Sequence, residues 1–312
     1  MTITIAEPLA TVDFGILYVA QASGEFAKQH LQVKITSAGS SALNEVISGQ
    51  SDLTIYSTGV ALTAVDEGKP LSVIYAAEAD YPSALVTSKN ITSISQLKSS
   101  QGCRLATLSP GAEEYYFGRY YVSNLGLPCT LVPVSTASAQ VAGVESGGYQ
   151  AAVLTYTQAL TVESAHSGNV LINPGSQADM TKYAPSRPYP SVVVFGVPSH
   201  LSSIKPAVTA FIQALKAAEG LMTTEPVSQI AALVVKSGEL PAVSQATVEQ
   251  DLKSEIPYMT SQLAVGQAAG SISDSTWTYT LSQLNEWGIQ GFNSASPANE
   301  FSSVVDMSYF NS

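Results

Sequence analysis

The chain has 312 residues, of which 45% are hydrophobic and 12% charged, and its formal net charge is −11 at pH 7. This length suggests about two domains, and this hydrophobic content excludes a disordered chain or a bare peptide module. The negative charge repels phosphate backbones and anionic headgroups, so nucleic acid is not an expected partner. No stretch approaches the roughly 18 consecutive apolar residues that span a bilayer. A weakly charged surface whose polarity comes from Ser, Thr, Gln and Tyr suits a protein outside the cytoplasm.

The first part of the chain alternates strand and helix patterns. Strands separated by helices imply a mostly parallel sheet that is covered on both faces. The period of the apolar residues predicts strands at residues 2–6, 32–36, 53–56 and 71–76, with helices at 15–29, 43–49 and 59–67 between them.

A second α/β pattern starts after residue 83. Its predicted strands are 84–87, 104–108, 130–133 and 151–155, and its predicted helices are 95–98, 112–125 and 138–146. The proline-rich stretch 173–190 breaks regular structure, and the apolar strand 191–197 follows it as a return crossing. The rest of the chain is predicted to be helical, at 206–223, 226–236, 244–256 and 273–287.

Motifs for catalysis are absent from the sequence. The patterns GxSxG, GxxxxGK[ST], GxGxxG and HExxH do not occur. The three histidines, His30, His166 and His200, lie far apart and lack the spacing of metal ligands. We therefore expect no catalytic residue, no metal and no cofactor.

Two cysteines, Cys103 and Cys129, each come just before a predicted strand of the second unit. They are either two buried thiols or one disulfide. If the two strands are parallel neighbours, the cysteines meet at the same end of the sheet, and we predict a disulfide there. That bond indicates an oxidising compartment.

The N-terminal residues 1–6 carry no basic segment and no apolar leader core, and their pattern predicts a strand. On this interpretation, the protein is cytosolic or a leader was removed from it.

Several short motifs occur in a familiar order. GILYVAQ at 15–21, GEF at 24–26 and LQV at 31–33 resemble the opening "G-x-Y-V-A-x-x-x-G-x-F … G-L-x-V" of the NMT1/THI5-like solute-binding proteins of ABC importers, which take sulfonates, nitrate, taurine and thiamine precursors. Further similar segments are SGQSDL at 48–53, GKPL at 68–71, 94–102, 143–152 with Tyr149-Gln150 in place of the usual acid, LNEWGI at 284–289 and VDMSYF at 305–310.

The resemblance implies a periplasmic-binding-protein type II fold, in which two α/β lobes joined by two crossings close over a ligand cleft. With the crossings near 84–87 and 191–197, lobe 1 is expected to comprise residues 1–83 and 192–312, and lobe 2 residues 84–191.

The resemblance also implies a non-enzymatic receptor. It would bind a small organic molecule and deliver it to the ABC-transporter permease in the membrane, acting as a monomer. Its location would be periplasmic, or extracytoplasmic and membrane-anchored as a lipoprotein. Two alternatives stay open: an enzyme on the same scaffold, desulfinase-like or pyrimidine-synthase-like, and a ligand-sensing domain.

Ligands of open α/β sheets bind beyond the carboxyl ends of the strands. We therefore look for ligand-binding residues in the loops that follow the predicted strands. Helix starts at 39–41 and 109–112 offer backbone N–H groups to an anionic group, although Ser40 and Ser109 also suit ordinary caps. Tyrosines can cover an apolar ligand, and Arg187 could pair with a carboxylate or sulfonate or stay solvated. The predicted ligand-binding residues are Asp13, Phe14, Ser40, Ser41, Tyr56, Ser57, Thr58, Tyr81, Ser109, Gly111, Ala112, Glu113, Tyr156 and Arg187.

Differences from the family pattern narrow the range of expected ligands. Asp13 stands where pyrimidine-precursor binders have the His of "N-x-x-H-x-G", which disfavours thiamine precursors. Glu7, Asp13 and Glu113 near the predicted cleft disfavour a strongly anionic ligand. The expected ligand is a small molecule with an aromatic or apolar body and mixed polar ends, with sulfonate- or carboxylate-bearing compounds as further options.

Overall fold

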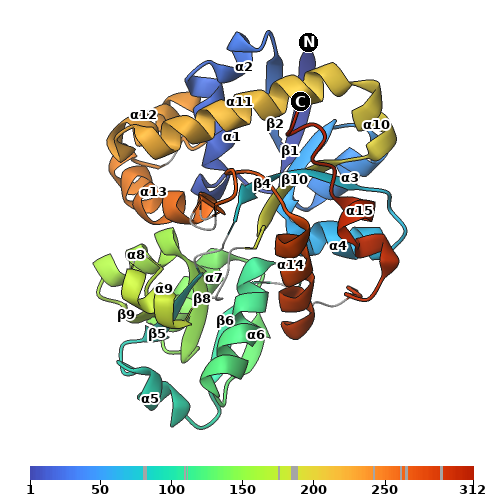
Figure 1. The fold of residues 1–312 in the computed structure, drawn as a ribbon. Coiled ribbons are helices and arrows are strands. Elements are labelled where there is room, and N and C mark those ends of the chain that lie inside the picture. The colour runs from blue at the N-terminus through green and yellow to red at the C-terminus, as the bar shows by residue number, and fades with distance from the viewer. Residues whose placement is uncertain are drawn as a thin grey trace. The chain divides into compact units, whose positions relative to one another are not determined.

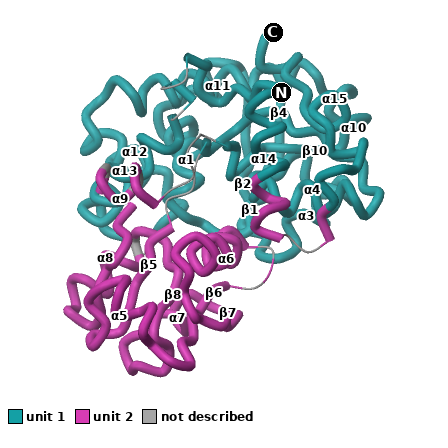
Figure 2. The backbone as a smooth tube through the Cα atoms, turned by 60° about the horizontal axis from the view of Figure 1, so that its bottom comes forward, with its two compact units in different colours: residues 1–80, 188–282, 293–312 teal, residues 81–187, 283–292 magenta. Residues whose placement is uncertain are grey.

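The computed structural model describes residues 1–79, 83–108, 110, 112–174, 176–183, 189–241, 243–260, 262–263, 266–288 and 291–312. Backbone contacts divide the chain into two compact units (Figure 2). Unit 1 comprises residues 1–80, 188–282 and 293–312, and unit 2 comprises 81–187 and 283–292. The predicted lobe limits at 83/84 and 191/192 stay predictions.

Unit 1 is built on a sheet of strand order β2-β1-β3-β10-β4 (Figure 1). Its strands are β1 (Thr2–Glu7), β2 (Gln32–Ser37), β3 (Leu53–Ser57), β4 (Ser72–Glu78) and β10 (Val192–Gly196). β1 runs parallel to β2 and β3, whereas β10 is antiparallel to both β3 and β4. β1, β2, β3 and β4 therefore run in one direction, as predicted for a mostly parallel sheet, and β10 is the one described strand of this sheet that runs the other way.

Helices cover both faces of this sheet. Ile3, Ile5 and Leu53 share one core cluster with apolar residues of α1 (Gly15–Ala22), α11 (Lys205–Thr224), α12 (Val227–Ser237) and α13 (Gln245–Met259). The helices α3 (Ala42–Ser48) and α4 (Thr58–Asp66) contact the strands without joining this cluster, so they lie on the other face. The remaining helical elements are α2 (Glu25–Lys28), α10 (Pro198–Ser203), α14 (Asp274–Glu286, which continues into unit 2), α15 (Phe301–Val304), η1 (Val12–Phe14), η2 (Gly39–Ser41) and η4 (Pro297–Asn299).

The helix predicted at 15–29 is two helices. Gly24 separates α1 from α2 with a φ of 81°, in the left-handed region that favours glycine. The apolar period continues across this break because both helices pack on the same core: Phe26 of α2 stacks on Phe211 of α11, with ring centroids 5.4 Å apart.

Unit 2 is built on a sheet of strand order β7-β6-β8-β5-β9. β6 is parallel to β7 and β8, whereas β5 is antiparallel to β8 and β9. Helices α7 and α8 share a core with β5, β6 and β8, and α6 packs on β6, β7 and β8, with its Gly118 against Thr107. Its elements are β5 (Ser83–Ser88), β6 (Arg104–Thr107), β7 (Thr130–Pro133), β8 (Ala151–Thr155), β9 (Gly168–Ile172), α5 (Ile94–Lys98), α6 (Glu113–Leu125), α7 (Ala137–Glu145), α8 (Tyr156–Ser164) and α9 (Gln177–Tyr183).

Three of these elements were not expected from the sequence. α8 and β9 lie in a stretch with a weak apolar period, and α9 forms inside the proline-rich region 173–190. α9 occupies residues between the prolines, so the prolines do not interrupt its hydrogen bonds.

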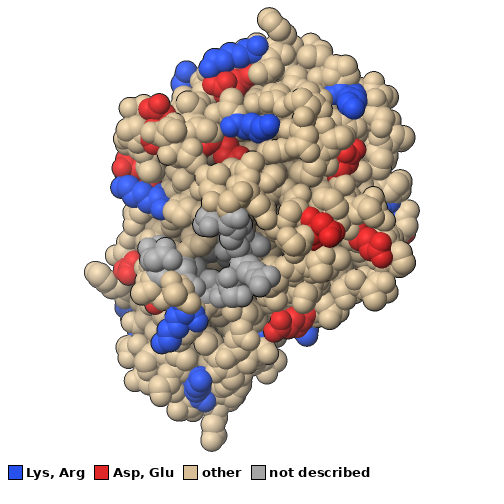
Figure 3. Space-filling model, in the orientation of Figure 1, with Lys and Arg blue, Asp and Glu red and all other residues tan. Residues whose placement is uncertain are grey.

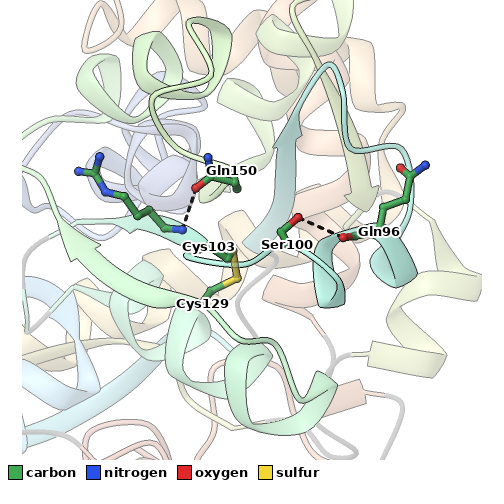
Figure 4. The surroundings of a disulfide bond; sticks show 6 residues. Gln96, Ser100, Cys103, Cys129 and Gln150 are labelled. Carbon is green, nitrogen blue, oxygen red and sulfur yellow. Dashed lines mark hydrogen bonds between the residues drawn. A yellow bond between two sulfur atoms is a disulfide. The ribbon is translucent and has the colours of Figure 1, made fainter.

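The predicted disulfide is confirmed. Cys103 and Cys129 are bonded (Figure 4). β6 and β7 run parallel, with Arg104 opposite Thr130. The bond lies at the amino ends of these strands. Nearby, the backbone N–H of Arg104 donates to the side-chain oxygen of Gln150 at 2.9 Å.

Charged side chains are sparse on the molecular face in Figure 3, where most atoms belong to uncharged residues. Within the part of the chain that the structure describes, no helix is long and apolar enough to cross a membrane.

The motif SGQSDL at 48–53 has a structural explanation. Gly49 ends α3 in the left-handed region, with a φ of 77°. The Asp52 carboxylate accepts hydrogen bonds from the backbone N–H of Thr4 (2.7 Å) and the Thr4 hydroxyl (2.8 Å), and its other oxygen lies 2.6 Å from His200 Nε2. Burial opposes ionisation of Asp52, but the Thr4 and His200 hydrogen bonds outweigh it and hold the pKa below its usual value. Asp52 therefore ties β1 to β3 and α10.

Replacing Asp52 with Ala is expected to lower the free energy of unfolding at pH 7 by about 1–2 kcal/mol, because Thr4 loses two hydrogen bonds to a charged acceptor. Because the pKa of Asp52 is lowered, the carboxylate is ionised at pH 7 and its full contribution to stability is present there. This contribution is lost as the pH falls through the pKa of Asp52. Denaturant unfolding of the variant, beside the exposed control Glu67→Ala, measures the difference. Equal stabilities of the two variants would show that Asp52 is not such a tie.

Candidate functional site

Polar residues occupy the carboxyl edge of the unit 1 sheet. Glu7 lies opposite Ser37 at the ends of β1 and β2. Val192 lies between Ser57 and Glu78, which end β3 and β4. Glu7, Ser57 and Glu78 are buried, so this edge holds polar groups that the fold shields from bulk water.

A hydrogen-bond network fixes Glu7. The Tyr18 hydroxyl donates to one carboxylate oxygen at 2.7 Å, and the Ser37 hydroxyl donates to the other at 2.8 Å. Burial raises the pKa of Glu7, and these two hydrogen bonds act against that rise. The tyrosine of the GILYVAQ motif therefore positions the end of β1, and its hydroxyl also accepts the backbone N–H of Thr11 at 3.3 Å.

Four carboxyl groups gather at the same edge. Burial, followed by the charges of Glu78, Asp13 and Asp251, raises the pKa of Glu255 well above its usual value. Burial raises the pKa of Asp13 to about 6, against a hydrogen bond from the Thr11 hydroxyl. Glu78 ends β4, Asp13 lies in η1, and the other two acids are on α13.

Sequence reasoning missed Glu255 and Asp251, although a signal exists. Val248, Asp251, Leu252 and Glu255 follow helical i, i+3, i+4, i+7 spacing, and all four are buried. Two acidic residues at apolar-stripe positions of a helix indicate that their carboxyl groups face the protein interior.

Two neighbouring candidates at the junction of β3 and α4, Ser57 and Thr58, differ in their hydrogen bonds. The Thr58 hydroxyl donates to the carbonyl of Pro190, and its N–H donates to the carbonyl of Ser191 at 2.8 Å. The Ser57 hydroxyl is buried and has no hydrogen-bond partner among the described residues. Tyr56, beside it, is half-buried. Thr58 therefore secures β10, whereas Ser57 keeps its hydrogen-bonding capacity.

The carboxyl edge of the unit 2 sheet is also polar. Ser83 begins β5 opposite Thr155, which ends β8, and Thr107 ends β6. Glu113 is the first residue of α6, which follows β6. Burial, followed by the charge of Glu114, raises the pKa of Glu113 to about 8.

The other predicted ligand-binding residues lie in varied surroundings. Phe14 is buried in the unit 1 core, and Ala112 is the N-cap of α6. Ser40 and Ser41 are exposed in η2, and the Ser41 hydroxyl donates to the carbonyl of Ala38 at 2.6 Å. Tyr156 is the first residue of α8 and is half-buried. The predicted residues Tyr81, Ser109, Gly111 and Arg187 lie outside the described residues. The ligand-binding role of every one of these residues stays a prediction.

Among the residues that the structure describes, no group of three or more His, Cys, Asp or Glu side chains is arranged to hold a metal ion. The acidic cluster of unit 1 is therefore a set of buried carboxyl groups without metal-site geometry.

Solved structures share this architecture. A zinc-bound ligand-binding component of an ABC-type import system from Staphylococcus aureus matches with a TM-score of 0.76 at 11% identity, over 100% of this chain and 98% of that one. The periplasmic nitrate-binding protein NrtA from Synechocystis matches with a TM-score of 0.74 at 14% identity, over 99% and 87%. The alkanesulfonate-binding protein SsuA from Xanthomonas axonopodis, bound to MOPS, matches with a TM-score of 0.66 at 16% identity, over 92% and 93%.

These structural matches establish the fold, which is the periplasmic-binding-protein type II fold expected from the motifs. No curated protein matches the chain in sequence. The family model described as "NMT1/THI5 like" matches residues 11–229, which include the GILYVAQ, SGQSDL and GKPL segments. The chain belongs to the NMT1/THI5-like family.

Proposed function

We propose that the protein is an extracytoplasmic solute-binding protein that captures a small organic molecule and delivers it to an ABC importer. The observation that carries the proposal is the set of buried side chains without partners at the carboxyl edges of both sheets: Ser57 in unit 1, and Ser83, Thr107 and Glu113 in unit 2. Native proteins leave few such groups, and each one calls for an explanation. A bound solute would supply the missing partners.

Two further observations support this function. The structures similar to this chain include a ligand-binding component of an ABC-type import system, a periplasmic nitrate-binding protein and a periplasmic aliphatic sulfonate-binding protein. The disulfide favours an oxidising compartment, which agrees with a periplasmic or membrane-anchored location. In this function the solute is bound and released unchanged, and closure of a hinged fold would present it to the permease.

The enzymatic alternative finds less support. A desulfinase-like reaction would need a cysteine nucleophile. The sequence has two cysteines, and both are in the disulfide. Neither sulfur is available as a thiolate for attack.

Solute binding can be tested by native mass spectrometry of freshly purified protein, followed by thermal-shift measurements with amines, sulfonates, carboxylates, pyrimidines and aromatic acids. A solute at about 100 times its Kd is expected to stabilise the protein by roughly 2.7 kcal/mol. The proposal fails if no solute shifts the melting temperature, or if one is consumed with turnover.

Replacing Ser57 with Ala separates a binding role from a structural one. Removing a buried hydroxyl that has no partner is expected to leave the ligand-free protein as stable or slightly more stable. The same change is expected to raise the Kd of the bound solute by about 10-fold, because the solute loses a hydrogen bond. Calorimetry of this variant, beside the exposed control Ser308→Ala, measures both effects. Unchanged affinity would remove Ser57 from the site.

A further inference from the structure

Three buried polar side chains lack partners at the carboxyl edge of the unit 2 sheet. Glu113 is 5% exposed, Ser83 1% and Thr107 0%. Both carboxyl oxygens of Glu113 and the two hydroxyl groups have no hydrogen-bond partner among the described residues. They come from the start of α6, the start of β5 and the end of β6, so three separate elements place them in this part of the unit.

Neighbouring contacts hold two of these residues in place. Thr107 packs its methyl group closely against α6 at Gly118, since a Cβ added to this glycine would lie only 2.6 Å from that methyl carbon. The Tyr121 hydroxyl of α6 donates to the carbonyl of Ser83 at 2.7 Å. The backbone and the apolar atoms are thus fixed, while the polar side-chain atoms are left without donors or acceptors.

Among these groups, the carboxyl group of Glu113 has the largest free-energy cost of being buried without a partner. An unpaired buried carboxylate is costly, and a buried acid without donors stays protonated instead. The raised pKa of Glu113 agrees with this state. A cation brought by a solute would remove the cost of ionising the acid, whereas an anion would increase it.

The neighbouring residue of Glu113 and the charge of the whole chain favour a cation as well. The adjacent Glu114 is also acidic and buried. The whole chain has a net charge of −11, which attracts cations from solution and repels anions.

We propose that unit 2 binds a protonated amine or amidine group of the solute, with Glu113 as its counter-ion and the Ser83 and Thr107 hydroxyls as further hydrogen-bond partners. This inference rests on the proposed solute-binding function and specifies the chemical class of the ligand. It selects cationic solutes over the sulfonates and carboxylates that the sequence motifs leave open.

Solutes that differ only in charge test the inference. Benzylamine, benzyl alcohol and benzoate form one matched set, and butylamine, butanol and butyrate form another; benzamidine, benzamide and benzenesulfonate form a third. These probes, together with any solute that copurifies with the protein, are titrated into wild-type protein by calorimetry. We expect the tightest-binding compound to carry an amine or amidine, and the matching anion to bind at least about 10-fold more weakly.

Variants of Glu113 provide the second arm. Glu113→Gln keeps the shape and removes the charge, and is expected to weaken binding of the cationic solute by about 30-fold or more. Glu113→Asp keeps the charge and is expected to recover part of that affinity. Glu145→Gln, an exposed acid at the end of α7 in the same unit, is the matched control and should bind like wild-type. Thermal melts of each variant establish that it is folded.

The possible failures are distinguishable. An anionic or neutral compound as the tightest binder, or full affinity of Glu113→Gln for the cationic solute, overturns the inference and leaves the receptor function in place. The absence of binding by every probe and every copurified compound contradicts the receptor function itself, and the inference with it.

Discussion

The ligand-free protein is expected to lose several kcal/mol of its free energy of unfolding between pH 5 and pH 8.5, at about 1.4 kcal/mol for each pH unit over which a buried acid keeps the proton that the unfolded chain has released. Burial raises the pKa of Glu219 and of Glu113 to about 8, and that of Asp13 to about 6. An acid whose pKa is higher in the folded protein than in the unfolded chain makes its full contribution to stability at pH values below the unfolded pKa. This contribution is lost as the pH rises to the folded pKa, because the unfolded chain releases the proton over this range while the folded protein keeps it.

Glu219 allows this effect to be isolated. It lies on α11 and is 3% exposed, and it accepts a hydrogen bond from the Tyr75 hydroxyl at 2.5 Å. Burial is the main cause of its raised pKa, and this hydrogen bond acts against the rise. Glutamine at this position keeps an acceptor for Tyr75 and cannot ionise. Glu219→Gln is therefore expected to be more stable than wild-type at pH 8.5 and similar to it at pH 5.

Denaturant unfolding at several pH values measures the change, with Glu225→Gln as the control. Glu225 is an exposed carboxyl group at the C-cap of the same helix. A stability that is flat from pH 5 to pH 8.5, or a Glu219→Gln variant with the same pH profile as wild-type, would show that these acids are not neutral in the folded protein.

Reduction of the Cys103–Cys129 disulfide is expected to lower stability by about 3.5 kcal/mol in the chain-entropy model. The bond joins residues 26 positions apart, so it restricts a loop of this length in the unfolded chain. Because the sequence has no further cysteines, a reducing agent acts on this bond alone.

Thermal melts with and without reductant test the disulfide, and the Cys103→Ser, Cys129→Ser double variant should behave like the reduced protein. Hydrogen exchange is expected to quicken first in β6 and β7, whose amino ends the bond joins. Equal melting temperatures under both conditions would contradict the prediction.

Sequence patterns alone predict the alternating strands and helices of residues 2–155, because the apolar period differs between a strand and a helix and each segment carries its own pattern. They also predict the disulfide, since both cysteines precede strands that prove to be parallel neighbours. The motifs at 15–21 and 48–53 identify the family, and the structure explains two of their residues: Tyr18 holds Glu7, and Asp52 holds Thr4.

Which polar groups share a site depends on how distant elements pack. Glu255 and Asp251 are on a helix far along the chain from Asp13 and Glu78, and packing of that helix brings the four acids together. The difference between Ser57 and Thr58 is also tertiary, since it depends on the carbonyl groups of residues 190 and 191 beside β3. Local periodicity reports which side of an element is buried. It does not report which distant element covers that side, and so it cannot show which buried polar groups find a partner.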